Sequence, residues 1–233
     1  VDIAEQLAID RVTKLFGCSF ANVQPHSGAS ANASVFFALM NPGDTFLGLN
    51  LAAGGHLTHG MKINYSGKWF NAVAYNVRRD DHRIDLVEMR KLAQEHRPKV
   101  IIAGGSAYPR IIDFKAFREI ADEVGALVMF DAAHMSGMIA GRAWQQPLEE
   151  GAHVMTMSTY KSLGGPPGGL IVSNDAAMME KIDAIAYPGL TANFDLGKTA
   201  ALAIAALDLI EHGEAYAAQC IDNAQALGAA LAT

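Results

Sequence analysis

Lys161 and Asp131 are the residues best suited to carry chemistry together. Asp131 directly follows the apolar run 126–130, and Lys161 comes shortly after a second run at 153–157. A lysine amine can form an imine with an aldehyde cofactor, and a carboxylate can hold a pyridine nitrogen protonated so that the ring accepts electrons. The pair therefore suggests an enzyme that holds a cofactor as a Schiff base on Lys161.

Each of these residues also has an ordinary interpretation. By itself, Asp131 could cap a helix or form a turn, and Lys161 could be a solvated loop lysine. Tyr160, beside the lysine, could orient it or donate a proton. The segment 164–169 is rich in glycine and proline but lacks the GK[ST] ending of a phosphate loop, so we expect it to keep the backbone tight beside Lys161.

A phosphate site is predicted at the start of an alanine-rich helical stretch. Ser27, Gly28 and Ala29 precede this stretch, where free backbone N–H groups and the helix dipole attract an anion. Ordinary capping of the helix by serine is the alternative.

Histidines are candidates for stacking against a planar cofactor ring. His56 and His59 are three residues apart, but neither an HExxH motif nor a convincing third ligand accompanies them, so we expect no metal. We expect His56 to stack on a planar ring and His134 to face the same pocket as Asp131. His59 and His153 are interpreted as structural histidines.

The elements that must position these residues alternate between strands and helices. This order predicts an α/β fold with a mostly parallel sheet covered by helices on both faces. Ligands collect at the carboxyl ends of such strands, where Ser106 also lies. The last of the six expected strands follows the previous one so closely that we expect the two to pair antiparallel. The expected strands are 46–49, 70–75, 99–103, 126–130, 153–157 and 169–173.

Two helices have clear start signals. Asp85 and Glu88 resemble a capping box before a helix that ends near Pro98. Asp113 is expected to cap a second helix, which stops at Gly125 and turns its apolar residues to the sheet. The residues of that apolar face are Phe114, Phe117, Ile120, Ala121 and Val124.

Composition narrows the class of protein. The 233 residues are 51% hydrophobic and carry a formal charge of −6 without a basic cluster, so we expect neither nucleic acid nor membrane as a partner. No apolar run approaches the roughly 20 residues that cross a bilayer, and we expect a cytoplasmic protein. Cys18 and Cys220 are too few for a disulfide framework. Both ends have helical patterns, so we expect a fragment of a longer subunit.

Several ordered segments resemble the serine hydroxymethyltransferase family, whose members are fold-type I enzymes dependent on pyridoxal 5'-phosphate. These segments are 21–28, 42–45, 54–60, 64–68, 105–108 and 118–122. The resemblance implies a three-layer α/β/α fold in which 1–233 is the cofactor-binding large domain, without the N-terminal arm and the C-terminal small domain. It also implies transfer of a one-carbon unit between serine and glycine, tetrahydrofolate as co-substrate, and a homodimer or higher homo-oligomer.

The resemblance assigns roles to individual residues. Lys161 is implied as the Schiff-base lysine, with Asp131 at the pyridine nitrogen and His56 stacked on the ring. His134 and Ser106 are implied near the phenolic oxygen of the cofactor. The remaining implied contacts are Ser27 and Gly28, with Ala29 at a family serine position, in the phosphate cup and Ser158 close to the lysine.

The segment around Lys161 departs from the family. A histidine and two arginines expected there are replaced across Tyr160 to Gly169, and Leu190 to Asn193 replaces an expected Gln-Gly-Gly-Pro. These changes suggest a specialised substrate such as α-methylserine, or cleavage of β-hydroxy amino acids without folate. A catalytically silent subunit with a role in regulation or oligomerisation is the remaining alternative.

Overall fold

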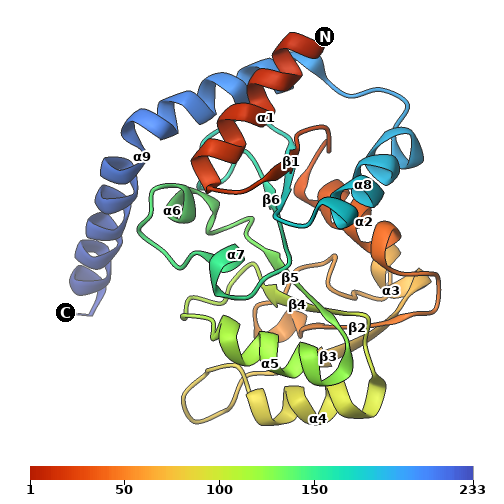
Figure 1. Ribbon diagram of the computed structural model, residues 1–233. Coiled ribbons are helices and arrows are strands. Elements are labelled where there is room, and N and C mark those ends of the chain that lie inside the picture. Colours follow the sequence, from red (N-terminus) through yellow and green to blue (C-terminus); the bar gives the residue numbers. More distant parts are fainter. Residues whose placement is uncertain (233) are drawn as a thin grey trace.

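The computed structural model describes residues 1–232 and places seven of their strands in one sheet. The strands follow the order β1-β7-β6-β5-β4-β2-β3 across the sheet (Figure 1). Their bounds are β1 (Phe20–Asn22), β2 (Thr45–Leu49), β3 (Asn71–Tyr75), β4 (Val100–Gly104), β5 (Leu127–Asp131), β6 (Val154–Ser158) and β7 (Gly169–Ser173).

The sheet is mostly parallel. β2 pairs in parallel with β3 and β4, and the parallel pairing continues through β5 to β6. β7 runs antiparallel to both β6 and β1. Only residues 159–168 separate β6 from β7, which is too short for a parallel crossover, and the predicted antiparallel pair is confirmed. β1 was not predicted, because three residues show too little alternation; its strand structure comes from its pairing with β7.

Helices cover both faces of the sheet. Alternate residues of β4 enter different cores: Ile101 packs among residues of α4 and α5, whereas Ile102 packs with Phe36 of α2 and Met179 of α8. The three-layer α/β/α architecture is therefore confirmed. The helices are α1 (Asp2–Phe16), α2 (Gly28–Leu39), η1 (Leu51–Ala53), α3 (Tyr65–Trp69), α4 (Leu86–His96), α5 (Phe114–Val124), α6 (Ser136–Ala140), α7 (Pro147–Glu150), α8 (Ala176–Ala184), η2 (Ile185–Leu190) and α9 (Leu196–Leu231).

Two predicted helix starts are observed, with one correction. Asp113 caps α5 by accepting the Ala116 N–H, and all five residues predicted for the inner face of α5 are buried. Asp85 caps α4, but Glu88 does not complete a capping box. The Glu88 carboxylate instead accepts a hydrogen bond from the Asn76 backbone N–H at 2.9 Å, because the loop before the helix lies within reach of the Glu88 side chain.

The first helix packs against the beginning of the last one on one side of the molecule. α1 lies along the first part of α9, where Arg11 donates to the Ala203 carbonyl at 2.8 Å (Figure 1).

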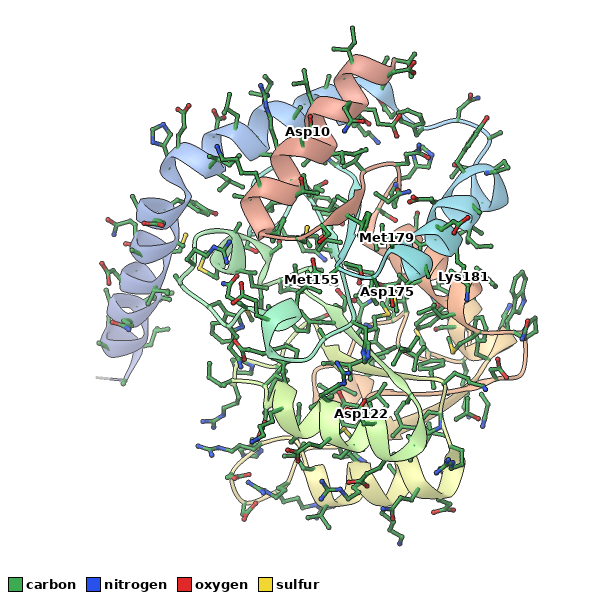
Figure 2. All side chains as sticks on the ribbon, viewed as in Figure 1. Asp10, Asp122, Met155, Asp175, Met179 and Lys181 are labelled. Atoms are coloured by element: carbon green, nitrogen blue, oxygen red, sulfur yellow. The ribbon has the colours of Figure 1, made fainter. Side chains whose placement is uncertain are left out.

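Met155 is buried in the interior, whereas Asp10 and Lys181 are exposed on the outer sides of their helices (Figure 2). Within residues 1–232, no helix combines the length and the apolar character required to span a bilayer.

Candidate active site

The predicted chemical residues gather at the carboxyl edge of the central strands. Asp131 is the last residue of β5, and its strand partners are Gly104 at the end of β4 and Thr156 in β6. The loops that carry Ser106 and Lys161 leave the same edge of these strands. Because parallel strands bring their carboxyl ends together, Asp131, Ser106 and Lys161 all lie at the edge of the sheet where ligands collect in such folds.

The Asp131 carboxylate is buried inside a set of hydrogen-bond donors. Its Oδ2 accepts from Asn32 Nδ2 and from His59 Nε2, both at 2.9 Å, and its Oδ1 accepts the Ala133 N–H at 3.2 Å. Burial alone raises the pKa of Asp131, but interactions with His59 and the other donors outweigh it and hold that pKa well below its usual range. Asp131 is therefore a buried, permanently ionised carboxylate at neutral pH.

Asn32 is a site residue that the sequence did not reveal. It lies in α2, is 1% exposed, and uses its second Nδ2 proton on Thr58 Oγ1 at 2.8 Å. Its Oδ1 accepts from Thr156 Oγ1 at 2.6 Å. One feature of the sequence could have indicated Asn32: it is a polar amide inside an alanine-rich helix. Asparagine is unfavourable in helix interiors unless its side chain is bonded elsewhere.

His56 and His59 lie in the turn after η1 and not on a shared helical face. His59 Nδ1 accepts the His56 N–H at 3.3 Å, which leaves its Nε2 to donate to Asp131. His59 is buried with both ring nitrogens bonded, as expected of a structural histidine. Ring or carboxylate atoms of His56, His59 and Asp131 lie within 4.8 Å of one another. His59 Nε2 donates to Asp131, and His56 Nδ1 is hydrogen-bonded to Thr58 Oγ1.

The turn that carries His56 is held by close backbone packing. A Cβ on Gly54, whose φ is +105°, would lie 2.9 Å from the Ala107 carbonyl, and the Ala107 N–H donates to the Gly54 carbonyl at 3.1 Å. A Cβ on Gly55 would overlap the Leu49 carbonyl oxygen. These contacts place Ser106, which is exposed, beside the turn that contains His56.

Lys161 is half-buried in the loop between β6 and β7. Its Nζ lies 5.7 Å from the centroid of the Tyr160 ring, and that ring is 50% exposed. The loop is tight, as predicted, because the Gly165 N–H donates to the Thr159 carbonyl at 2.7 Å and the Gly164 N–H donates to the Lys161 carbonyl at 2.9 Å. These hydrogen bonds constrain the loop backbone and so limit the directions in which the Lys161 side chain can extend.

The charge of Lys161 acts on two of the predicted histidines. Burial lowers the pKa of His56, and the charge of Lys161 lowers it further while Asp131 raises it. Burial is also the largest cause that lowers the pKa of His134, and the charge of Lys161 lowers that pKa further. Lys161 therefore lies close enough to His56 and His134 for its charge to act on both, and their lowered pKa values keep both histidines neutral at pH 7.

The start of α2 lies directly against the end of β6. Ser27 caps the helix by accepting the Ser30 N–H at 3.1 Å, so the ordinary capping interpretation is correct for its side chain. A Cβ on Gly28 would lie 3.0 Å from the Ser158 nitrogen. The Ser158 hydroxyl is buried and has no hydrogen-bond partner among the described residues. Ala29, in the first turn, is exposed.

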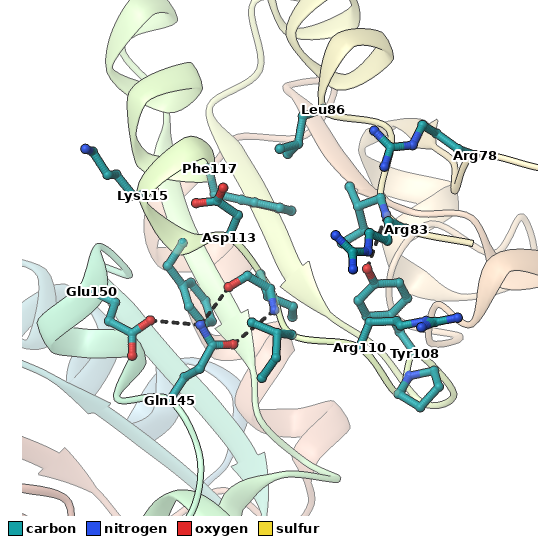
Figure 3. Close-up of a pocket in the computed structure, with 15 residues that line it drawn as sticks. Arg78, Arg83, Leu86, Tyr108, Arg110, Asp113, Lys115, Phe117, Gln145 and Glu150 are labelled. Carbon is teal, nitrogen blue, oxygen red and sulfur yellow. Dashed lines mark hydrogen bonds between the residues drawn. The ribbon is translucent and has the colours of Figure 1, made fainter. Parts of the chain in front are cut away.

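A separate cavity of about 930 Å³ lies beyond the site (Figure 3). Tyr108, two residues after Ser106, forms part of its wall and accepts the Ile84 N–H at 3.2 Å. Gln145 bridges the opposite side by donating to Glu150 and to the Ile112 carbonyl. The predicted site residues do not line this cavity, so its size alone does not mark the place where Asp131 and Lys161 act.

Comparison with known proteins identifies the family. A family model described as serine hydroxymethyltransferase matches residues 1–233. The serine hydroxymethyltransferase of Hyphomonas neptunium is 54% identical over 234 residues, which cover 100% of this chain and 54% of the relative. That of Rhodospirillum centenum is 55% identical, with 97% of this chain and 53% of the relative covered. That of Methylorubrum extorquens strain PA1 is 56% identical, with coverages of 97% and 52%.

The chain spans about half the length of the curated relatives it matches. The match nevertheless extends over nearly all of its own residues, including each of the segments in which the resemblance was found. The chain therefore belongs to the serine hydroxymethyltransferase family.

Proposed function

We propose that residues 1–233 form the cofactor-binding large domain of a pyridoxal-phosphate enzyme that transfers a hydroxymethyl group from serine or an α-substituted serine. The observation that carries this proposal is the buried Asp131 carboxylate, which its hydrogen-bond donors hold ionised at the strand edge from which the loop with Lys161 also leaves. The names of the relatives support the reaction class. Tetrahydrofolate is the expected one-carbon acceptor.

The residues present fit the cofactor. The buried Ser158 hydroxyl lacks a partner in the described part of the chain, and it lies beside the first turn of α2, where helix N–H groups favour a phosphate. A side chain at Gly28 would narrow the space between this turn and Ser158. Asp131 Oδ1 accepts one hydrogen bond, from Ala133, so a carboxylate lone pair remains for a pyridine N–H.

The bound cofactor would supply an aldehyde that bonds to an amine and a protonated ring that accepts electron density from the substrate. Asp131 would hold the proton at the ring nitrogen, because its own low pKa keeps the carboxylate ionised. Ser27, Gly28, Ala29 and Ser158 line the phosphate end of the site.

The remaining residues act at the opposite end. Lys161 would supply the amine that holds the cofactor. His56 would cover one face of the ring, and His134 and Ser106 would lie near the phenolic oxygen. The Tyr160 ring, whose centroid lies 5.7 Å from Lys161 Nζ, would orient the lysine or exchange a proton with it.

Labelling of Lys161 tests this proposal. Full-length protein supplied with pyridoxal phosphate is reduced with borohydride, and the modified lysine is located by mass spectrometry. We expect a pyridoxyl label at Lys161 and its loss in Lys161→Gln, with Lys181→Gln as a matched control on the exposed side of α8. Protein that binds the cofactor but carries no label at Lys161 would show that this lysine does not anchor it and would favour the silent-subunit alternative.

The substrate is proposed from the altered loop. Tyr160 and the arginine-free segment Gly164 to Gly169 stand where the family has a histidine and two arginines. We expect α-methylserine to be turned over with tetrahydrofolate faster than serine. Assays of serine, threonine and α-methylserine, each with and without tetrahydrofolate, separate this activity from folate-independent cleavage. Equal turnover of serine with no gain for α-methylserine would overturn the specialised substrate.

The family also suggests the working assembly. We propose a cytoplasmic homodimer or higher homo-oligomer from the family resemblance, with a remodelled contact at segment 190–193, where the family sequence that reaches the neighbouring subunit is replaced. Light scattering of the full-length protein is expected to show at least a dimer, and a monomer at all concentrations would contradict this part of the proposal.

A further inference from the structure

Asp131 and His56 belong to one closed ring of hydrogen bonds. One branch runs from Asp131 through His59 to the backbone N–H of His56. The other runs from Asp131 through Asn32 and Thr58 to Nδ1 of the His56 ring, with distances of 2.9, 2.8 and 2.8 Å. The two branches meet at the same histidine, so the carboxylate constrains both its backbone and its ring.

The charge of Asp131 fixes the direction of the bonds at Asn32. A carboxylate only accepts, so the amide must present Nδ2 to Asp131 and to Thr58, and its Oδ1 must face Thr156. The reversed amide would place two acceptors, its own oxygen and the carboxylate, against each other. Asn32, Thr58 and Thr156 are each at most 1% exposed, so water does not compete for these groups.

The direction of the bonds continues to His56. The Thr58 backbone N–H points at His56 Nδ1 from 3.2 Å, which makes Nδ1 an acceptor. The Thr58 hydroxyl accepts from Asn32 and lies 2.8 Å from the same Nδ1, to which it donates. Two donors therefore face Nδ1, and the proton of the ring is left on Nε2.

We propose that Asn32 and Thr58 are positioning residues that keep His56 neutral, with its single proton on Nε2, and so match its ring to the cofactor. A second proton on Nδ1 would face the Thr58 N–H and displace both hydrogen bonds. A neutral ring can lie beside a protonated pyridine ring without the repulsion that an imidazolium would cause. The charged and titratable groups that act on His56 are Asp131, His59, Lys161 and His134.

The protonation state inferred for His56 does not depend on the proposed function. Only the match between the His56 ring and the cofactor rests on that function. The protonation of His56 is measured on the protein without cofactor, whereas the proposed function is tested by the label at Lys161. Loss of the label with an unchanged His56 would defeat the proposed function alone, and the reverse result would defeat this inference alone.

The test uses ¹⁵N-labelled full-length protein and the two ring nitrogen shifts of His56. We expect the pattern of a neutral ring protonated at Nε2 at pH 7. Thr58→Val keeps the shape but removes the hydroxyl, and we expect it to raise the pKa of His56 by about half to one unit. Thr58→Ser keeps the hydroxyl and is expected to retain the wild-type pKa.

Asn32→Ala extends the test to the cofactor. Removing its donor to Asp131 is expected to weaken binding of pyridoxal phosphate at least about tenfold. Asn22→Ala is the matched control, because Asn22 is also buried and donates its amide to a carboxylate, Asp183, at 2.8 Å outside the site. Equal cofactor affinity in both folded variants would overturn the role of Asn32.

Two further results would overturn the inference. One is a wild-type His56 that is cationic at pH 7 or protonated at Nδ1, which is decided on the unaltered protein even if a variant does not fold. The other is a folded Thr58→Val variant in which the pKa and the tautomer of His56 are those of the wild type.

Discussion

Gly104→Ala would disturb the sheet and the site together. Gly104 ends β4 with a φ of +93° and is the strand partner of Asp131. A Cβ there would overlap the Asp131 carbonyl oxygen and lie 2.9 Å from the Phe130 ring. The substitution therefore forces an unfavourable backbone conformation on alanine and also requires β4 and β5 to separate beside the carboxylate.

Gly43 isolates the first of these two effects. Its φ of +90° nearly equals that of Gly104, but a Cβ on Gly43 has no heavy atom within 4 Å among the described residues. Gly43→Ala should cost about 1–2 kcal/mol for the left-handed backbone alone. Gly104→Ala should cost about 1–3 kcal/mol more, because the interior must also admit the added atom.

Equilibrium unfolding of the full-length variants in urea measures this difference. Since about 1.4 kcal/mol corresponds to a tenfold change in an equilibrium constant, the effect of the clash is readily resolved. Pyridoxal-phosphate binding should also weaken in Gly104→Ala and not in Gly43→Ala, because only the first substitution displaces Asp131. Equal losses of unfolding free energy and unchanged cofactor affinity in both variants would refute the reasoning.

Three further predictions concern the core and the buried polar network. Thr156→Val leaves Asn32 Oδ1 without a donor and should lower the unfolding free energy by about 1–3 kcal/mol, whereas Thr156→Ser should lose about 1 kcal/mol at most. Phe117→Ala removes a fully buried ring and should cost about 3–5 kcal/mol in denaturant, against a change within about 0.5 kcal/mol for the exposed Val87→Ala. The pKa of Asp131 is lower in the folded chain than its unfolded value of about 3.9, so its contribution is present above that pH and is lost as the pH falls through the folded pKa. In urea titrations from pH 7 to pH 2, the stability advantage of the wild type over Asp131→Asn should therefore diminish below about pH 4, and a difference independent of pH would contradict the ionised, buried carboxylate.

Local patterns predicted the elements that are stabilised by neighbours in sequence. The inner face of α5 follows from apolar residues three and four positions apart, and its start follows from Asp113. The position of Asp131 at the carboxyl edge also follows from sequence, since it directly follows an apolar run. The strand β1 was missed because its pairing with β7 joins residues about 150 positions apart, such as Phe20 and Ser173.

The candidate site was only partly visible in the sequence. Lys161, Asp131 and His56 were predicted, and their roles toward the cofactor stay predictions. Asn32 was missed because its bonds to Thr58, Asp131 and Thr156 join positions 26, 99 and 124 residues apart. The partner of His59 was missed for the same reason, since Asp131 is 72 residues away.

The sequence by itself determined the strands β2 to β7, the inner face of α5, and the edge of the sheet at which Lys161 and Asp131 would emerge. These features depend on the period of apolar residues and on local caps, which act over a few positions. Only the tertiary structure decided which buried donors surround Asp131 and which nitrogen of His56 faces Thr58. Those choices depend on packing between distant segments, where burial obliges each polar group to find a partner.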